Sequence, residues 1–392
     1  MSWILPDPDP SGLPAAVWLL EFLLVFTFIL HVLVMNVALG GGLVSGWATW
    51  RARRWGRRGS SVQEVRYRAV AGSLAKLLPV STAFAITTGV APLLFVQVLY
   101  GQLFYSSSVL MAWPWLAVVA LLLVGYYGYY GLSFVLGGTE AGRPGAITTP
   151  AAGAVEGAGP SATPASTLLL AAGSGLVFVA IALIFTNNMT LMLRPDRFGA
   201  LYGASDAGLH ANLGDPWVWP RFLHVVVGSL AVTGIVMGLV GRLRTWSDPA
   251  LGPWITALGA RLFILATLVQ LAVGAWLLFS LPHVVRDVVL TGGPELMLLV
   301  TGVGFALLAV LVVRRSVVLA LVPLVVTIVD MAIVRHQVRT LTLVPYFSVD
   351  SMAVNAQTGV FILFAVLLVA GLAVVSWMVW RLAAARRVAT AE

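Results

Sequence analysis

Histidines inside or beside long apolar runs are the residues of this chain that point to chemistry. His31 lies well inside an apolar run, and His224, His283 and His336 each lie near the end of another. An ionisable side chain within a membrane span is costly unless it has a partner or a ligand. Each of these histidines therefore marks a candidate site, whereas His210 lies in a polar loop and is expected to be solvated.

The kinds of side chain present favour haem iron over other metal chemistry. Imidazole and thioether groups are both axial ligands of haem iron, and Met297 stands at the start of an apolar run. The chain has no cysteine, which excludes disulfides, iron–sulfur clusters and covalent c-type haem. Converging histidines with a nearby methionine thus indicate b-type haem. The alternative is that helix-end histidines cap helices or bond backbone carbonyls.

Few acids and arginines lie within the apolar runs. Glu21 is expected to pair with an arginine, and Asp330, five residues before Arg335, to join a polar cluster. Arg335 and Arg339 stand one helical turn apart, where guanidinium groups would bind haem propionates or lipid phosphates. Ordinary snorkelling of the arginines toward the membrane surface is the alternative.

The elements that must position these residues are membrane helices. The 392 residues are 60% hydrophobic and 10% charged, and several apolar runs reach the roughly 20 residues that cross a hydrocarbon core. The pattern predicts an all-α integral membrane protein with about nine transmembrane helices. The helices are expected at residues 15–50, 69–100, 109–137, 166–187, 221–243, 255–281, 294–313, 315–337 and 358–382.

The distribution of arginines predicts the orientation of these helices. Residues 51–68 hold seven arginines and are expected to form a loop, whereas the next loop, at 100–108, holds none. By the positive-inside rule, residues 51–68 are cytoplasmic, the N-terminus lies outside and the C-terminus lies inside. His224, His283 and His336 would then collect toward the extracytoplasmic face. The net charge of +8 is a topology signal and not a nucleic-acid surface.

The chain is expected to form one polytopic domain over residues 1–392. Residues 138–165, rich in Gly, Ala, Pro and Thr, predict a flexible cytoplasmic linker. Residues 188–220 predict a longer outer loop with aromatic and polar side chains. The first apolar run is too long for a signal peptide and has no positive segment before it, so we expect it to be retained as a helix.

Residues 220–234, PRFLHVVVGSLAVTG, resemble the helix of cytochrome bd quinol oxidase subunit I that carries a low-spin haem b ligand. That family has R-F-x-H followed nine and ten residues later by T-G. His31 matches the family's haem-ligating histidine in the first helix, and nine helices with an outside N-terminus is the family's topology. The remaining matches are Arg221, Phe222, His224, Thr233 and Gly234 in this motif, and Lys76, Leu77, Thr88 and Gly89 in the second helix.

The resemblance implies a set of cofactor ligands and partners. His224 and Met297 would ligate one low-spin haem b, and His31 a second haem whose other side is open or filled by His336. Two or more haems b are expected, whereas haem d has no support in the sequence. The resemblance also implies a bacterial-type cytoplasmic (inner) membrane location. Membrane lipid, a second membrane subunit, quinone and a c-type cytochrome are the expected partners.

Three departures from the family bear on the reaction. The loop at 281–293, LPHVVRDVVLTGG, is too short for the family's quinol site. The expected third helix contains no acid, whereas the family has glutamates there that are associated with proton delivery to the oxygen site. His336 stands near the position of a glutamate haem ligand. These departures favour electron transfer over oxygen reduction.

The expected function is therefore a bd-like membrane b-type cytochrome of a respiratory chain. It would pass electrons between the quinone pool and an extracytoplasmic donor or acceptor such as a c-type cytochrome. One alternative is a terminal quinol oxidase, so the sequence leaves open an oxidoreductase or an electron-transfer subunit. The other is a haem-free transporter or scaffold, in which residues 40–42, Pro79 and Pro92 would break helices.

Overall fold

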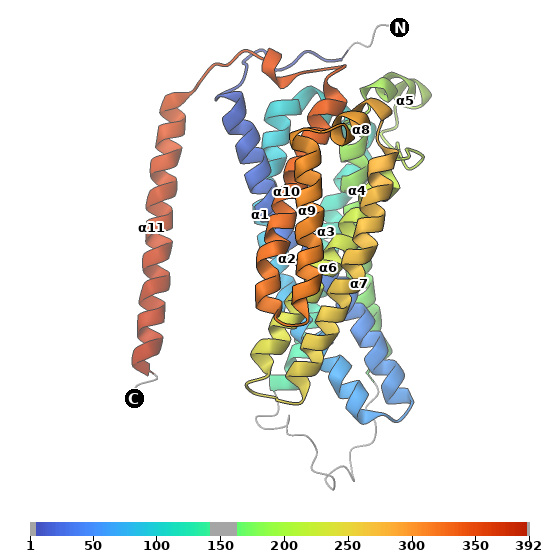
Figure 1. Cartoon of the computed structure of the whole chain (residues 1–392), viewed down its shortest axis with the longest axis vertical. Coiled ribbons are helices and arrows are strands. Elements are labelled where there is room, and N and C mark those ends of the chain that lie inside the picture. The colour runs from blue at the N-terminus through green and yellow to red at the C-terminus, as the bar shows by residue number, and fades with distance from the viewer. Residues whose placement is uncertain (1–4, 142–162, 390–392) are drawn as a thin grey trace.

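The chain folds as long helices in the computed structural model, which describes residues 5–141 and 163–389 (Figure 1). Nine helices of this described part are long and apolar enough to cross a membrane, and no strand occurs in it beyond one isolated bridge. The expected all-α multi-pass fold is confirmed. The nine are α1 (Val17–Arg57), α2 (Ser61–Leu110), α3 (Ala112–Ala141), α4 (Ala165–Leu191), α6 (Val218–Arg244), α7 (Leu251–Ser280), α9 (Pro294–Val313), α10 (Val317–Leu343) and α11 (Thr358–Ala389).

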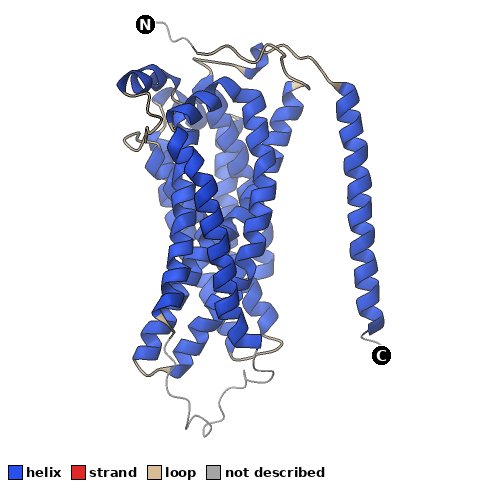
Figure 2. Cartoon of the chain, turned by 180° about the vertical axis from the view of Figure 1, so that it is seen from behind, coloured by secondary structure: helices blue, strands red, loops and turns tan. Residues whose placement is uncertain are grey.

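Helices that follow one another along the chain pair side by side. α1 packs with α2, α6 with α7, and α9 with α10, while α3 packs on α4. α1 also contacts α4 and α6, which places it inside the bundle. α11 stands apart from the other helices in both views (Figures 1 and 2), and nearly all of its described side chains are exposed. The site is therefore built by the other eight long helices.

The prediction of a loop at residues 51–68 is wrong, because most of this segment is helical. α1 continues through Arg57 and α2 begins at Ser61, with Gly59 in a left-handed conformation (φ 77°) between them. Arginine, glutamine and glutamate are good helix formers, so charge alone does not end a helix. The arginine-rich segment thus forms the tip of a continuous helical hairpin.

The second expected loop, at residues 100–108, is also helical. α2 passes through this segment with a kink at Tyr100 (φ −134°, ψ 30°), and a single residue, Met111, separates its end from the start of α3. Pro79 and Pro92 lie inside α2 without interrupting it, and residues 40–42 lie inside an unbroken α1. The helix breaks that a transporter would place at these positions are absent.

Short elements cover the end of the bundle where α6 begins. The segment between α4 and α6 contains η1 (Pro195–Arg197) and α5 (Phe198–Ala204), and η2 (Val349–Ser351) precedes α11. α8 (His283–Leu290) follows α7 after a break at Pro282, so His283 begins a separate short helix and is exposed. Of the expected linker at 138–165, α3 includes the start, whereas residues 142–162 lie outside the described residues.

Three consecutive glycines let α1 approach four other helices. A Cβ at Gly40 would overlap the Ser229 carbonyl of α6, and one at Gly42 would overlap the Tyr129 hydroxyl of α3. Gly41 faces α2, and Gly175 of α4 lies against Gly42. Small residues allow such close packing between membrane helices.

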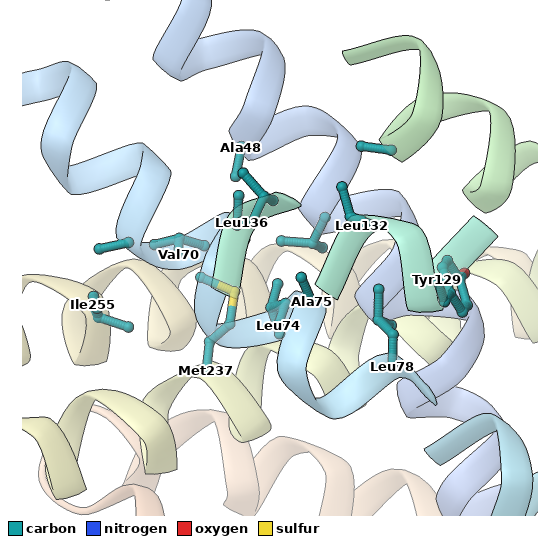
Figure 3. Packing of buried hydrophobic residues seen from close by; sticks show 14 of the residues in the cluster. Ala48, Val70, Leu74, Ala75, Leu78, Tyr129, Leu132, Leu136, Met237 and Ile255 are labelled. Carbon is teal, nitrogen blue, oxygen red and sulfur yellow. The ribbon is translucent and has the colours of Figure 1, made fainter. Parts of the chain in front are cut away.

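A large apolar cluster fills the space between these helices. Tyr129 is fully buried, donates a 2.9 Å hydrogen bond to the Ala38 carbonyl and stacks on Phe178. Leu74 and Leu78 of α2 belong to the same cluster (Figure 3). This cluster holds α1, α2, α3 and α4 together at the level of the glycines.

The arginine-rich turns lie at one end of the molecule. The α1–α2, α6–α7 and α9–α10 turns and the C-terminus are all at the lower end of Figure 1. The starts of α6 and α9 and the ends of α7 and α10 lie at the opposite end. The grouping expected for the ends that carry His224 and His336 is thus present.

Candidate functional site

His31 is fixed between α1 and α2 by one hydrogen bond and one close contact. Its Nδ1 donates a 2.9 Å hydrogen bond to the backbone carbonyl of Ala85, since a carbonyl oxygen only accepts. In the neutral ring, Nε2 then carries the free lone pair, as in histidines whose other nitrogen bonds a carbonyl while one binds a metal. The ring lies on Gly89 of α2, where a Cβ would be 2.8 Å from Cε1.

His224 lies on α6 with one ring nitrogen unsatisfied. Its Nδ1 is buried and has no hydrogen-bond partner among the residues that the structure describes. Gln270 of α7 donates a 2.9 Å hydrogen bond to the His224 carbonyl, and a Cβ at Gly274 would lie 3.4 Å from Cε1 of the ring. A buried polar atom without a partner costs about 1–3 kcal/mol. The ring is therefore suited to a ligand that the chain does not itself supply.

Three arginines of α6 and α10 lie close enough to repel one another. Arg335 interacts electrostatically with Arg221, Arg339 and His31. Arg339 is only 4% exposed. The guanidinium carbons of Arg335, Arg339 and Arg221 lie 4.4, 5.5 and 5.3 Å from the ring centres of Phe28, Tyr100 and Trp217, respectively. This concentration of positive charge next to a histidine suits a ligand that carries carboxylates.

His336 pairs with an acid of α1. Its Nε2 lies 3.4 Å from Oε1 of Glu21, and its Nδ1 is buried without a hydrogen-bond partner in the described part of the chain. An arginine is the partner expected for Glu21, and that expectation is wrong as a direct contact because α10 packs on α1 with His336 opposite the carboxylate. Arg339 interacts with the Glu21 charge over a longer distance.

Two other candidates are not brought into this group by any described contact. Met297 is 72% exposed at the start of α9, so its ligation of the same iron as His224 stays a prediction. Asp330 forms no ion pair with Arg335 within the described residues. Its Oδ2 is buried without a hydrogen-bond partner, beside Gly302 of α9.

The segment before α6 is anchored by a buried carboxylate. Asp215 is fully buried, accepts a 2.8 Å hydrogen bond from Arg194 and lies 3.4 Å from Arg197. It also accepts a 2.9 Å hydrogen bond from the backbone N–H of Trp217. Hydrogen bonding to Asp196, reinforced by Asp215, raises the pKa of the Arg194 guanidinium. This network fixes the start of α6 and therefore the depth of His224 within the helix bundle.

His210 lies in the same outer segment, away from the polar group of α1, α6 and α10. Its Nε2 donates a 2.7 Å hydrogen bond to the Ser205 carbonyl, and its backbone N–H bonds the Leu110 carbonyl at the end of α2. Its role is that of a loop residue held by backbone contacts.

Sequence patterns single out some of these residues without giving them a role. Arg221 and Gly89 stand in the motifs around His224 and in the second helix, but their positions next to Arg335 and His31 follow only from helix packing. Gln270 is missed altogether. The signal for it is that it is the one amide in the apolar stretch ATLVQLAVGAWLL.

No protein-family model and no curated protein matches this chain. No group of three or more His, Cys, Asp or Glu side chains that could hold a metal ion occurs among the described residues. A porphyrin supplies most of the ligands of its iron, so one or two imidazoles suffice. The free Nε2 of His31, the unpartnered Nδ1 of His224 and the three arginines fit a haem with its propionates.

Proposed function

We propose that the chain is a bd-like membrane b-type cytochrome that transfers electrons between the quinone pool and an extracytoplasmic protein such as a c-type cytochrome. The observation that carries this proposal is the state of His31. An imidazole inside the helix bundle, with Nδ1 bonded to a carbonyl and no hydrogen-bond partner for Nε2 among the described residues, is suited to bind haem iron. The relationship to cytochrome bd subunit I remains part of the proposal.

His31 and His224 would hold haem b through their free ring nitrogens. Arg335, Arg339 and Arg221 would neutralise its propionates, because the three guanidinium groups lie near one another and Arg335 lies near His31. When bound, the haem supplies one-electron redox chemistry. Met297 and His336 are further candidate ligands, and for His336 this would involve Nδ1, since its Nε2 faces Glu21.

The residues of the chain suit electron transfer better than oxygen reduction. Reducing oxygen to water consumes protons, which a buried site receives through acidic or other titratable side chains. α3 has no acid between residues 112 and 137, where the family has glutamates. The chain's own residues would hold and orient the cofactor and neutralise its charge. In the proposed orientation the arginine-rich end faces the cytoplasm of a bacterial-type inner membrane.

The test is spectroscopy of the purified full chain. A pyridine haemochrome assay is expected to give haem b, and a reduced-minus-oxidised spectrum a low-spin α-band. His224→Ala should remove that band and His31→Ala should lower the haem content, while the loop variant His210→Ala should leave both unchanged. A colourless wild-type protein would refute the proposal. Quinol-dependent oxygen uptake with a CO-binding haem would establish the oxidase alternative instead.

A further inference from the structure

A cavity of about 730 Å³ opens at the arginine-rich end of the bundle, between α6, α7, α9 and α10. Four of its lining residues are arginines, and none is acidic. Its floor and walls are largely small and apolar. The cavity is lined by Arg242, Arg261, Arg314 and Arg315 and by apolar residues that include Ala257 and Val313.

The four arginines have no counter-charge among the residues that the structure describes. All four side chains are exposed to the cavity or the surface. Within the described residues, no ion pair, hydrogen bond or ring contact involves the guanidinium group of Arg242, Arg261, Arg314 or Arg315. Like charges gathered around one cavity repel one another. The arrangement is stable only with an anion from outside the chain or with full hydration.

Arg261 distinguishes these two possibilities. Loop arginines at this end are accounted for by orientation in the membrane. Arg261, however, lies in α7, ten residues after its start at Leu251. A charged side chain in a membrane-spanning helix calls for a partner. Because Arg261 lies within the helix and lines the cavity, orientation in the membrane does not account for it, and an anion at the headgroup level would give it a partner.

The depth of the arginines is that of a lipid phosphate. The 20 residues of α9 rise about 30 Å, which is the thickness of the hydrocarbon core, and Arg314 and Arg315 follow directly. The segment from Arg261 to Ser280, at the far end of α7, has the same length. Arg261, Arg314 and Arg315 therefore stand together at one boundary of the hydrocarbon core.

The rest of the cavity suits an acyl chain. Ala257, Ala260, Val313 and Val317 line it with apolar surface. Trp246, at its rim, is 91% exposed, as is typical of tryptophans at the level of lipid headgroups. A free phosphate ion would use the arginines and leave this apolar surface without a partner.

We infer that this cavity binds the phosphate group of an anionic phospholipid, with the arginines around the phosphate and an acyl chain along the alanines and valines. Basic pockets between membrane helices on one side of the membrane are recognised sites for anionic headgroups. This inference does not depend on the proposed electron transfer, since no residue of the cavity belongs to the candidate haem site.

The experiment is native mass spectrometry of the detergent-solubilised full chain, titrated with phosphatidylglycerol or with phosphatidylcholine of the same acyl chains. Phosphatidylglycerol adducts are expected to form preferentially. The double variant Arg314→Gln/Arg315→Gln should weaken phosphatidylglycerol binding about tenfold or more, because each arginine near an anionic lipid contributes severalfold. The control Arg57→Gln/Arg58→Gln removes two charges at the same end but outside the cavity, and should leave binding unchanged.

Further arms separate the sources of the phosphate and guard against misfolding. Ala257→Trp fills the apolar part without touching a charge and should also abolish the adduct in a monodisperse, helical protein. Persistent binding in that variant, equal loss in the control, or equal binding of phosphatidylcholine would overturn the inference. Displacement of phosphatidylglycerol by millimolar inorganic phosphate would show that the cavity takes free phosphate and would overturn it as well.

Discussion

The imidazole of His31 rests directly on Gly89, across the packed pair α1 and α2. A Cβ at position 89 would lie 2.8 Å from Cε1 and 2.9 Å from Nδ1 of His31. Nδ1 is also the atom that bonds the Ala85 carbonyl, so the ring cannot move away without losing that hydrogen bond. A glycine on one helix thus sets the direction of a ring nitrogen on the other.

Gly89→Ala is expected to displace the His31 ring. Overpacking of this kind costs about 1–3 kcal/mol, and here it also breaks the bond to Ala85. The melting temperature in detergent should fall, and the haem content measured by pyridine haemochrome should fall with it. The control is Gly173→Ala on α4, where an added Cβ meets nothing within 4 Å. Equal behaviour of the two variants would contradict the assigned packing.

Asp215→Asn is expected to destabilise the protein much more than Asp196→Asn. Both carboxylates bond Arg194, but the side chain of Asp215 is 0% exposed and that of Asp196 is 29% exposed. Removing one partner of a buried pair costs about 3–5 kcal/mol, whereas exposed pairs contribute about 0–1 kcal/mol. Thermal unfolding in detergent measures both, and similar melting temperatures for the two variants would speak against a structural role of Asp215.

Gly40→Ala is expected to separate α1 from α6. The added Cβ would overlap the backbone carbonyl of Ser229, which cannot rotate away as a side chain can. The loss of stability should exceed the roughly 1 kcal/mol that alanine gains over glycine within a helix. Gly304→Ala on α9, with open space around its Cβ, should be neutral or stabilising. A Gly40→Ala protein as stable as wild type would rule out the close crossing.

Glu21 and His336 are expected to be coupled only weakly. Their side chains are 29% and 16% exposed, and the atoms are 3.4 Å apart, so water screens the pair in part. A double-mutant cycle with Glu21→Gln and His336→Gln should give a coupling of about 0.2–1 kcal/mol in unfolding free energy. A coupling of zero would show that the two side chains do not meet in solution.

The membrane helices can be predicted from the apolar runs of the sequence. The wrong loop predictions fall on polar and charged segments between these runs. Each apolar run long enough to cross a membrane forms a helix, because a chain segment in lipid must satisfy its own backbone hydrogen bonds and a helix does so within one segment. Charged segments such as 51–68 are ambiguous, since water satisfies their backbone equally well as loop or helix. Pro282 does end α7, as a proline is expected to, whereas Pro79 and Pro92 are accommodated within α2.

The candidate site was predictable as a set of residues but not as a set of contacts. His31 and His224 are polar exceptions in apolar runs, which makes them visible without any structure. The pairing of Glu21 with His336 depends on how α1 and α10 are rotated about their axes, and weak periodicity in such uniformly apolar helices hides that rotation. Gln270 is missed for the same reason, because its hydrogen bond to the His224 carbonyl depends on how α7 packs on α6.

The separation of α11 from the other helices makes the chain modular. The segment before α11 is joined to the N-terminal segment by backbone hydrogen bonds: the Leu13 N–H donates to the Ala353 carbonyl, and the Asn355 N–H donates to the Leu13 carbonyl. Nearly all described side chains of α11 are exposed, so it contributes little to the packing of the bundle. Substitutions among the described apolar residues of α11 are therefore not expected to disturb the candidate site, which the other eight long helices build.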